Sequence, residues 1–300
     1  MNFLMSYQPL LDILLIGLGF AYSQQIVLRA GVFSIATAGF ASVGAYCAAI
    51  LAKSYGVPAI VALALSLLLG AFIGWLLAVP LSRLRGIYQA IATLAFVQIV
   101  TSIMLIAEPV TGGGFGINEI PKSITTWHLL AIGAVLIYFM RALKRSGVGR
   151  AFDAIQQDET VGAVLGVSIR KYHALAFMIS GAIAGLYGGL ESLHSYSLTP
   201  GQYSFGFAVT VLAFIVVGGR RSVIGPLIGV AFLSILPEVS RPFAEYRPMI
   251  TGVVMVLVMN FIPLGLADTL FIWLRRTRAQ GEQKAAPAAK KGAGYVGTGA

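Results

Sequence analysis

Three long stretches of the chain contain no charged residue: residues 32–52, 57–80 and 87–107. Each is long enough to cross a hydrocarbon layer about 30 Å thick as an α-helix that rises about 1.5 Å per residue. Continuous apolar runs favour helices over the alternating strands of a membrane barrel, because a helix satisfies its own backbone hydrogen bonds. The sequence therefore predicts an integral membrane protein built from helices.

Six further apolar runs bring the expected total to about eight to nine spans, so we predict an all-α, polytopic transmembrane helical bundle. They cover residues 10–26, 127–143, 172–190, 203–218, 223–240 and 249–267. The seventh and eighth spans are short, and either a tilted, a broken or a partly re-entrant course suits residues 203–240. We expect one transmembrane domain over residues 1–274. Residues 275–300, rich in Ala, Gly and Lys, are expected to form a disordered cytoplasmic tail.

The basic residues predict the orientation. With nine spans and a cytoplasmic C-terminus, only Lys53, Lys122, Arg241 and Arg247 of the 21 Lys and Arg residues fall on the outer side. Because loops on the cytoplasmic side of a membrane carry the excess of Lys and Arg, this orientation is favoured. The net charge of +10 is thus a topological signal, and its dispersal among short loops argues against a nucleic-acid partner.

Several classes of function are disfavoured by what the sequence lacks. A single cysteine, Cys47, and scattered histidines give no metal-ligand spacing, and we expect neither a metal nor a cofactor. The Gly-rich segment 111–116 lacks the Lys-Ser/Thr ending of a phosphate-binding loop, and no catalytic constellation can be assembled. We therefore expect no enzyme. An ion-coupled secondary transporter remains the rival class, with Asp12 and Glu238 as the candidate intramembrane carboxylates.

The longest connection, residues 144–171, has a helical plan of its own. Asp158 can cap a short helix, Glu159 suits the positive end of its dipole, and Gly166 fits the position just after its end. Before it, Phe152 and Ile155 share a face. Two interpretations fit: an amphipathic helix on the membrane surface, or a docking element that offers charges of both signs and exposed apolar contacts to a cytosolic partner.

Two kinds of position inside the spans carry further predictions. Small residues spaced by four, at Gly70/Gly74, Gly181/Gly185/Gly189 and Gly225/Gly229, favour close helix packing. Polar residues within spans are costly and mark candidate pathways. Our candidates for the substrate pathway are polar positions of the second and fourth spans, an uncharged lining that suits a small zwitterion or a neutral solute: Thr37, Ser42, Tyr46, Gln89, Thr93 and Gln98.

Ordered sequence blocks resemble the permeases of branched-chain amino acid ABC transporters, specifically the LivM type. One block is residues 149–160 with Ala163, Leu165 and Gly166. The others occur in the family's order and extend the resemblance over roughly residues 31–263: residues 34–36 with 44–46, 84–96, 111–113, 180–185, and 217–219 with 224–226. Each block alone is weak, but the ordered set is specific.

The resemblance implies a permease subunit of a heteromeric importer in the bacterial inner membrane, in contact with membrane lipid. A homologous second permease subunit, two cytosolic ATP-binding subunits and a periplasmic substrate-binding protein would complete it. The solute would be a branched-chain or related small amino acid, with urea, short amides or aromatic acids as the alternatives. Within the connection 144–171, a cytoplasmic coupling helix would contact an ATPase subunit through Arg150, Phe152, Asp153, Ile155, Asp158, Glu159 and Gly166.

Overall fold

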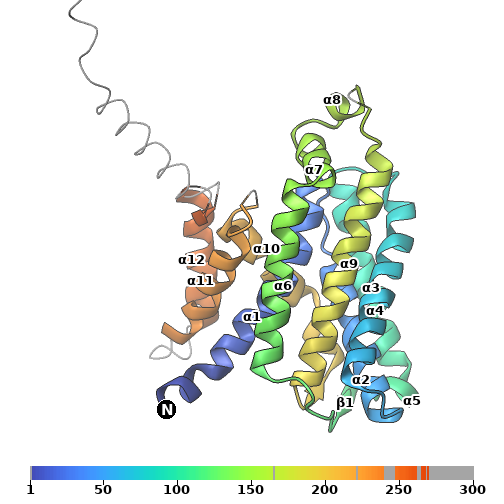
Figure 1. The fold of residues 1–300 in the computed structure, drawn as a ribbon, viewed down its shortest axis with the longest axis vertical. Coiled ribbons are helices and arrows are strands. Elements are labelled where there is room, and N and C mark those ends of the chain that lie inside the picture. The colour runs from blue at the N-terminus through green and yellow to red at the C-terminus, as the bar shows by residue number, and fades with distance from the viewer. Residues whose placement is uncertain are drawn as a thin grey trace, which may run out of the picture.

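The computed structural model of the chain describes residues 2–164, 166–220, 222–239, 247–261, 265–267 and 269. Within these residues, a helix stands at each of the nine predicted apolar runs (Figure 1). These helices are α1 (Asn2–Arg29), α2 (Thr37–Ser54), α3 (Ala59–Leu81), α4 (Ile87–Ile106), α6 (Thr126–Arg145), α9 (Ile169–His194), α10 (Phe205–Gly218), α11 (Gly225–Val239) and α12 (Arg247–Phe261). The tail predicted at residues 275–300 lies outside the described residues.

Short elements occupy the connections. They are α5 (Glu108–Thr111), η1 (Gly113–Phe115), α7 (Gly147–Gln157), α8 (Glu159–Val164), η2 (Pro200–Tyr203) and the two-residue strands β1 (Ile117–Asn118) and β2 (Ser197–Leu198). The strands pair antiparallel, with Ile117 opposite Leu198. The predicted all-α class is confirmed.

Five segments in the described part of the chain are long and apolar enough to cross a membrane by length and composition. They are residues 8–29 of α1 and the whole of α3, α4, α6 and α9. The helices of the seventh and eighth runs, α10 and α11, have only 14 and 15 residues. The prediction that these two spans are short is therefore confirmed.

Helix α9 lies at the centre of the bundle and packs against α2 and α3 with almost no side chain between the backbones. A Cβ atom added to Gly70 would overlap the carbonyl of Gly181, and one added to Gly44 would overlap the backbone of Gly185. Small residues allow this close approach, which replaces the hydrophobic driving force that lipid-embedded helices lack. The sequence-based expectation that these glycines serve packing is confirmed, and we call this contact the glycine seam.

Successive connections between the long helices lie alternately at the two opposite ends of the bundle (Figure 1). At the α7 end, drawn at the top, α7 contacts the end of α1, and α8 contacts the α3–α4 connection. At the β1 end, drawn at the bottom, β1 pairs with β2, and Lys53 Nζ donates a hydrogen bond to the Asn118 carbonyl at 2.6 Å. Connections that the charge pattern assigns to one side of the membrane thus lie together.

Candidate functional site

The connection between α6 and α9 forms two short helices joined at a single residue. Ser146 begins α7, and its hydroxyl accepts a hydrogen bond from the Gly149 N–H at 3.3 Å. A serine at this position satisfies one of the N–H groups that the first turn of a helix leaves free. Asp158 both ends α7 and precedes α8, so the chain turns sharply there.

Asp158 caps α8 as the sequence predicted. Its Oδ1 accepts from the Thr160 hydroxyl at 2.5 Å, from the Thr160 N–H at 2.7 Å and from the Val161 N–H at 3.4 Å. The hydrogen bonds from the Thr160 side chain and from these two backbone groups lower the pKa of the Asp158 carboxyl below its ordinary value, because they favour the charged form. The carboxylate is therefore the capping species at neutral pH.

Gly166 ends α8 in the left-handed conformation, with φ of +81°. The Val167 N–H donates to the Gly162 carbonyl and the Gly166 N–H to the Ala163 carbonyl, both at 3.0 Å. This pair of bonds is the Schellman motif, which favours glycine because other side chains rarely adopt a positive φ. The prediction that Gly166 follows the end of this helix is confirmed.

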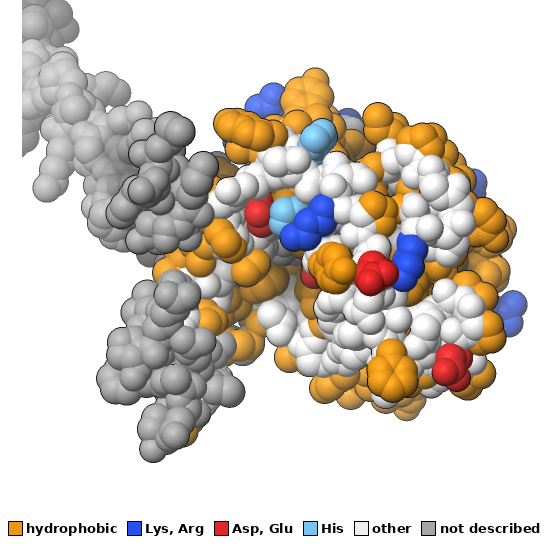
Figure 2. Space-filling view, turned by 90° about the horizontal axis from the view of Figure 1, so that it is seen from below, with side chains coloured by type: hydrophobic (Ala, Val, Ile, Leu, Met, Phe, Trp, Pro, Cys, Tyr) orange, Lys and Arg blue, Asp and Glu red, His pale blue; other side chains and the backbone are white. Residues whose placement is uncertain are grey.

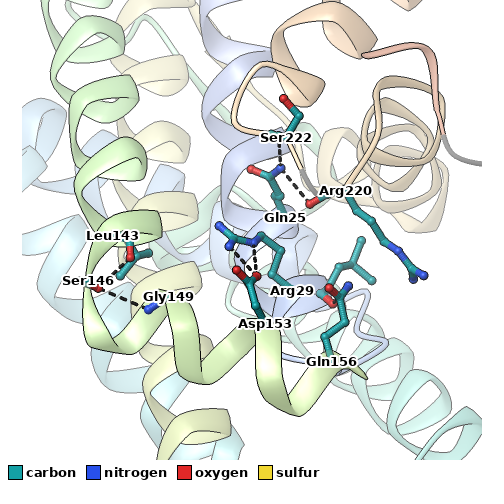
Figure 3. A network of polar contacts seen from close by, with 10 residues as sticks. Gln25, Arg29, Leu143, Ser146, Gly149, Asp153, Gln156, Arg220 and Ser222 are labelled. Carbon is teal, nitrogen blue, oxygen red and sulfur yellow. Dashed lines mark hydrogen bonds and ion pairs between the residues drawn. The ribbon is translucent and has the colours of Figure 1, made fainter. Parts of the chain in front are cut away.

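Helix α7 is attached to the end of α1 by polar contacts (Figure 3). Arg29 donates from Nη2 and Nε to Asp153 Oδ1, at 2.6 and 3.2 Å, and its side chain is only 4% exposed. Gln156 donates to the Leu28 carbonyl at 3.2 Å. A guanidinium buried to this degree requires a partner, so this ion pair fixes α7 to the first span.

A second ion pair attaches α8 to the α3–α4 connection, from Arg85 Nη1 to Glu159 Oε2 at 3.3 Å. The Arg85 side chain is 74% exposed, so this pair contributes little to stability. The loop is thus held at the end of α1 and at the α3–α4 connection by two ion pairs of unequal strength. Arg150 stays exposed and donates to the Arg145 carbonyl at 3.2 Å.

The two apolar residues expected to contact a partner, Phe152 and Ile155, face inward instead. They are 1% and 2% exposed, and the Phe152 ring lies edge-on to that of Tyr172, with centroids 6.2 Å apart. The expectation of exposed apolar contacts from these residues is wrong. The 11-residue helix α7 packs its apolar face against the rest of the permease. This contact removes the apolar face from water, which is favourable.

Among the described residues of the loop, the large apolar side chains that are exposed belong to α8. Val161 is 56% exposed and Val164 is 88% exposed. Beside them, a groove of about 360 Å³ opens between the two helices, lined by Arg150, Asp153, Ala154, Gln157, Asp158 and Val161. The loop therefore presents an apolar edge next to charges of both signs, and we call this surface the docking face.

Helix α1 carries polar side chains that the sequence analysis did not single out. Gln24 Nε2 donates to the Ser34 carbonyl at 2.6 Å, and its Oε1 accepts from the Thr37 hydroxyl at 2.6 Å. Gln25 Nε2 donates to the carbonyls of Arg220 and Ser222, at 3.1 and 2.7 Å (Figure 3). Two adjacent glutamines at the end of an apolar run are a signal that could have found them, since amides inside a span require partners.

Of the six predicted pathway residues, all but Gln98 are buried in helix packing. Thr37, Ser42, Tyr46, Gln89 and Thr93 are each at most 4% exposed, whereas Gln98 is exposed on α4. The Thr93 hydroxyl accepts from the Ile35 N–H at 3.0 Å and donates to the Ala90 carbonyl at 2.9 Å. Gln89 reaches the Leu81 carbonyl at 3.4 Å. The structure brings Thr37 and Thr93 to the same α1–α2 connection, and it places Gln98 apart from them.

A bundle of apolar helices with a folded loop at one end is the architecture of a polytopic membrane protein. The chain belongs to the family described as the permease component of branched-chain amino acid transport systems, which matches residues 10–262. The resemblance to the LivM type that the sequence blocks indicated is confirmed.

Several curated permeases are similar to the chain in sequence. The chain is 31% identical to the high-affinity branched-chain amino acid transport system permease protein LivM of Escherichia coli, over 90% of this chain and 71% of the relative. The same identity and coverage hold for LivM of Salmonella typhimurium. The permease protein LivH of Escherichia coli is 30% identical over 48% of each chain. No solved structure matches the chain.

Proposed function

We propose that the chain is the transmembrane permease subunit of an ATP-driven ABC importer for branched-chain or related small amino acids. The observation that carries the proposal is the attachment of α7 to the end of α1 through the ion pair between the buried Arg29 and Asp153. A partner that moves the loop would move the first span with it. The names of the LivM relatives supply the substrate class.

The mechanism we propose is alternating access. Partner subunits bind and hydrolyse ATP, and they favour one state of the permease over the other by binding the docking face with different affinity in each. Val161 and Val164 give the apolar contacts of that face, and Arg150 and Asp158 its charges. Phe152 and Ile155 hold α7 in place from behind.

The assembly we propose contains a homologous second permease, two cytosolic ATP-binding subunits and a periplasmic substrate-binding protein. The matches to both LivM and LivH proteins support two different permeases. The polar positions of α2 and α4 remain our proposal for the pathway, in a state in which the contacts between Thr93 and the α1–α2 connection open.

The orientation we propose places the α7 end and the C-terminus of this inner-membrane protein in the cytoplasm. In the described part of the chain, the β1 end holds Lys53 and Lys122, and most other basic residues belong to the opposite end. In a Cys47→Ala background, an impermeant thiol reagent applied from outside should modify Gly114→Cys and spare Arg83→Cys. The reverse pattern contradicts the orientation.

The function is tested by reconstituting the complete transporter in vesicles and measuring ATP-dependent uptake of L-leucine. The variant Val161→Asp with Val164→Asp should lower uptake and co-purification of the ATP-binding subunits at least about tenfold, because it buries two charges at the contact. Val110→Asp with Phe115→Asp, two exposed apolar residues of the β1 end, is the matched control and should leave both unchanged. Normal uptake by the α8 variant would refute the docking face, and absence of uptake by the wild type would refute the function.

A further inference from the structure

A cavity of about 620 Å³ opens at the β1 end between α1, α9 and α10. Its volume lies in the range of small-molecule sites. Figure 2 looks onto this end and shows an acidic, a histidine and a basic side chain next to one another at the edge of a hollow. The cavity is separate from the docking face and from the polar positions of α2 and α4, none of which line it.

One wall of the cavity carries carboxylates set within the apolar helices. Asp12 is only 7% exposed; its Oδ2 lies 3.2 Å from His194 Nε2, and its Oδ1 is buried without a hydrogen-bond partner. Glu191 lines the same cavity and accepts from the Tyr203 hydroxyl at 2.7 Å. A carboxylate oxygen buried without a donor is costly, and ionisable groups inside a span mark substrate paths.

The remaining walls complete a site with three chemistries. Lys122 lines the cavity at its outer rim. Phe20 and Phe207 form an apolar side, with their rings edge-on and centroids 5.0 Å apart. Carboxylate, ammonium and aromatic surface around one space are complementary to a molecule that carries an ammonium, a carboxylate and an apolar side chain.

We propose that this cavity receives an apolar α-amino acid as a zwitterion, on its way from the outer side into the transporter. Asp12 Oδ1 and Glu191 bind its ammonium group, Lys122 meets its carboxylate, and the Phe20–Phe207 wall takes its side chain. The inference rests on the proposed function and adds to it the residues that recognise the substrate within the permease.

The experiment uses the complete transporter in vesicles and an L-leucine analogue with a photoreactive diazirine in its side chain. Light should attach the analogue to peptides that contain residues 8–20 or 207–214. Excess L-leucine should suppress the labelling, and 4-methylvalerate, which lacks the ammonium group, should not. Asp12→Asn and Glu191→Gln should each lower the labelling about tenfold, the effect of losing one charge-assisted hydrogen bond.

Two further variants separate binding from folding. Thr210→Phe fills the cavity from α10 without touching a charge, and it should lower labelling and leucine uptake while the ATP-binding subunits still co-purify. Glu108→Gln removes an exposed carboxylate of the same end that does not line the cavity, and it should change neither.

The outcomes distinguish this inference from the proposed function. If the wild type imports L-leucine but Asp12→Asn, Glu191→Gln and Thr210→Phe import and label normally, the cavity is not the site and the function stands. Labelling confined to other helices has the same meaning. If the wild type imports no amino acid, the function and the site both fail.

Discussion

Between α3 and α9 the helices meet backbone against backbone, whereas at the α7 end polar side chains connect α7 to the end of α1. In the glycine seam, Gly70 rests on the carbonyl of Gly181, and Ser66 donates to the Gly44 carbonyl at 2.9 Å. At the α7 end, one partly buried ion pair and an amide hydrogen bond hold α7 to α1, and Gln25 holds α1 to the α10–α11 connection.

The difference indicates which part of the bundle is rigid and which part moves. Closely packed backbones have one arrangement, because any sliding produces overlap. Polar side chains can exchange one partner for another at small cost when the alternative partner is near. We therefore expect α2, α3 and α9 to move as one body, and the α7 end to change its contacts during transport.

The largest effect should follow from breaking the glycine seam. Gly70→Ala places a methyl group on the Gly181 carbonyl, so α3 and α9 must separate along their length. Overpacking of this kind costs about 1–3 kcal/mol or more. We expect a clear loss of folded permease in thermal unfolding monitored by size-exclusion chromatography in detergent.

Gly252→Ala is the matched control for this change. Gly252 lies inside α12, and a Cβ there meets no atom within 4 Å. Replacing a helical glycine by alanine in open space is neutral or slightly stabilising. Equal losses from the two substitutions would show that the seam has no special role.

A smaller effect, measured as loss of transport, should follow from Thr93→Phe. The hydroxyl of Thr93 on α4 accepts a hydrogen bond from Ile35 in the α1–α2 connection. A phenyl ring at position 93 would obstruct a pathway that opens between α4 and this connection. We expect leucine uptake to fall at least about tenfold, a barrier change of about 1.4 kcal/mol, with the ATP-binding subunits still bound. Thr101→Phe, farther along α4, is the control. Normal uptake by the Thr93 variant would move the pathway elsewhere.

The smallest effect should follow from Asp158→Ala, which removes only the cap of α8. The loop keeps the Arg29–Asp153 pair and the buried Phe152, so membrane insertion should be unchanged and substrate-stimulated ATPase activity should fall partially. A wild-type level of stimulation would show that the cap is dispensable.

The same residue predicts a pH dependence. The pKa of Asp158 is lowered in the folded loop, so the contribution of the cap is fully present above the ordinary carboxyl pKa. It is lost as the pH falls through the lowered pKa. The wild type and Asp158→Ala should therefore differ in hydrogen exchange of α8 at neutral pH, and the difference should disappear in acid. A difference that persists in acid contradicts this.

Much of the local structure followed from the sequence alone. The apolar runs gave the helices, because a chain in lipid must satisfy its backbone within each segment. The sequence also predicted the Asp158 cap and the helix end at Gly166, because both depend on residues within one or two turns of each other. The ordered sequence blocks also predicted the protein family, which the family match confirms.

Tertiary structure alone decided which helices pair and where the polar groups meet. Gly70 and Gly181 are far apart in the chain, and four-residue spacing does not say which two helices it joins. Phe152 and Ile155 share a face, but only the fold shows that this face is turned inward. Asp12 and His194 meet across 182 positions, so the cavity at the β1 end could not be predicted. The local sequence pattern determines which residues share a face of a helix. Packing against distant segments determines what that face contacts.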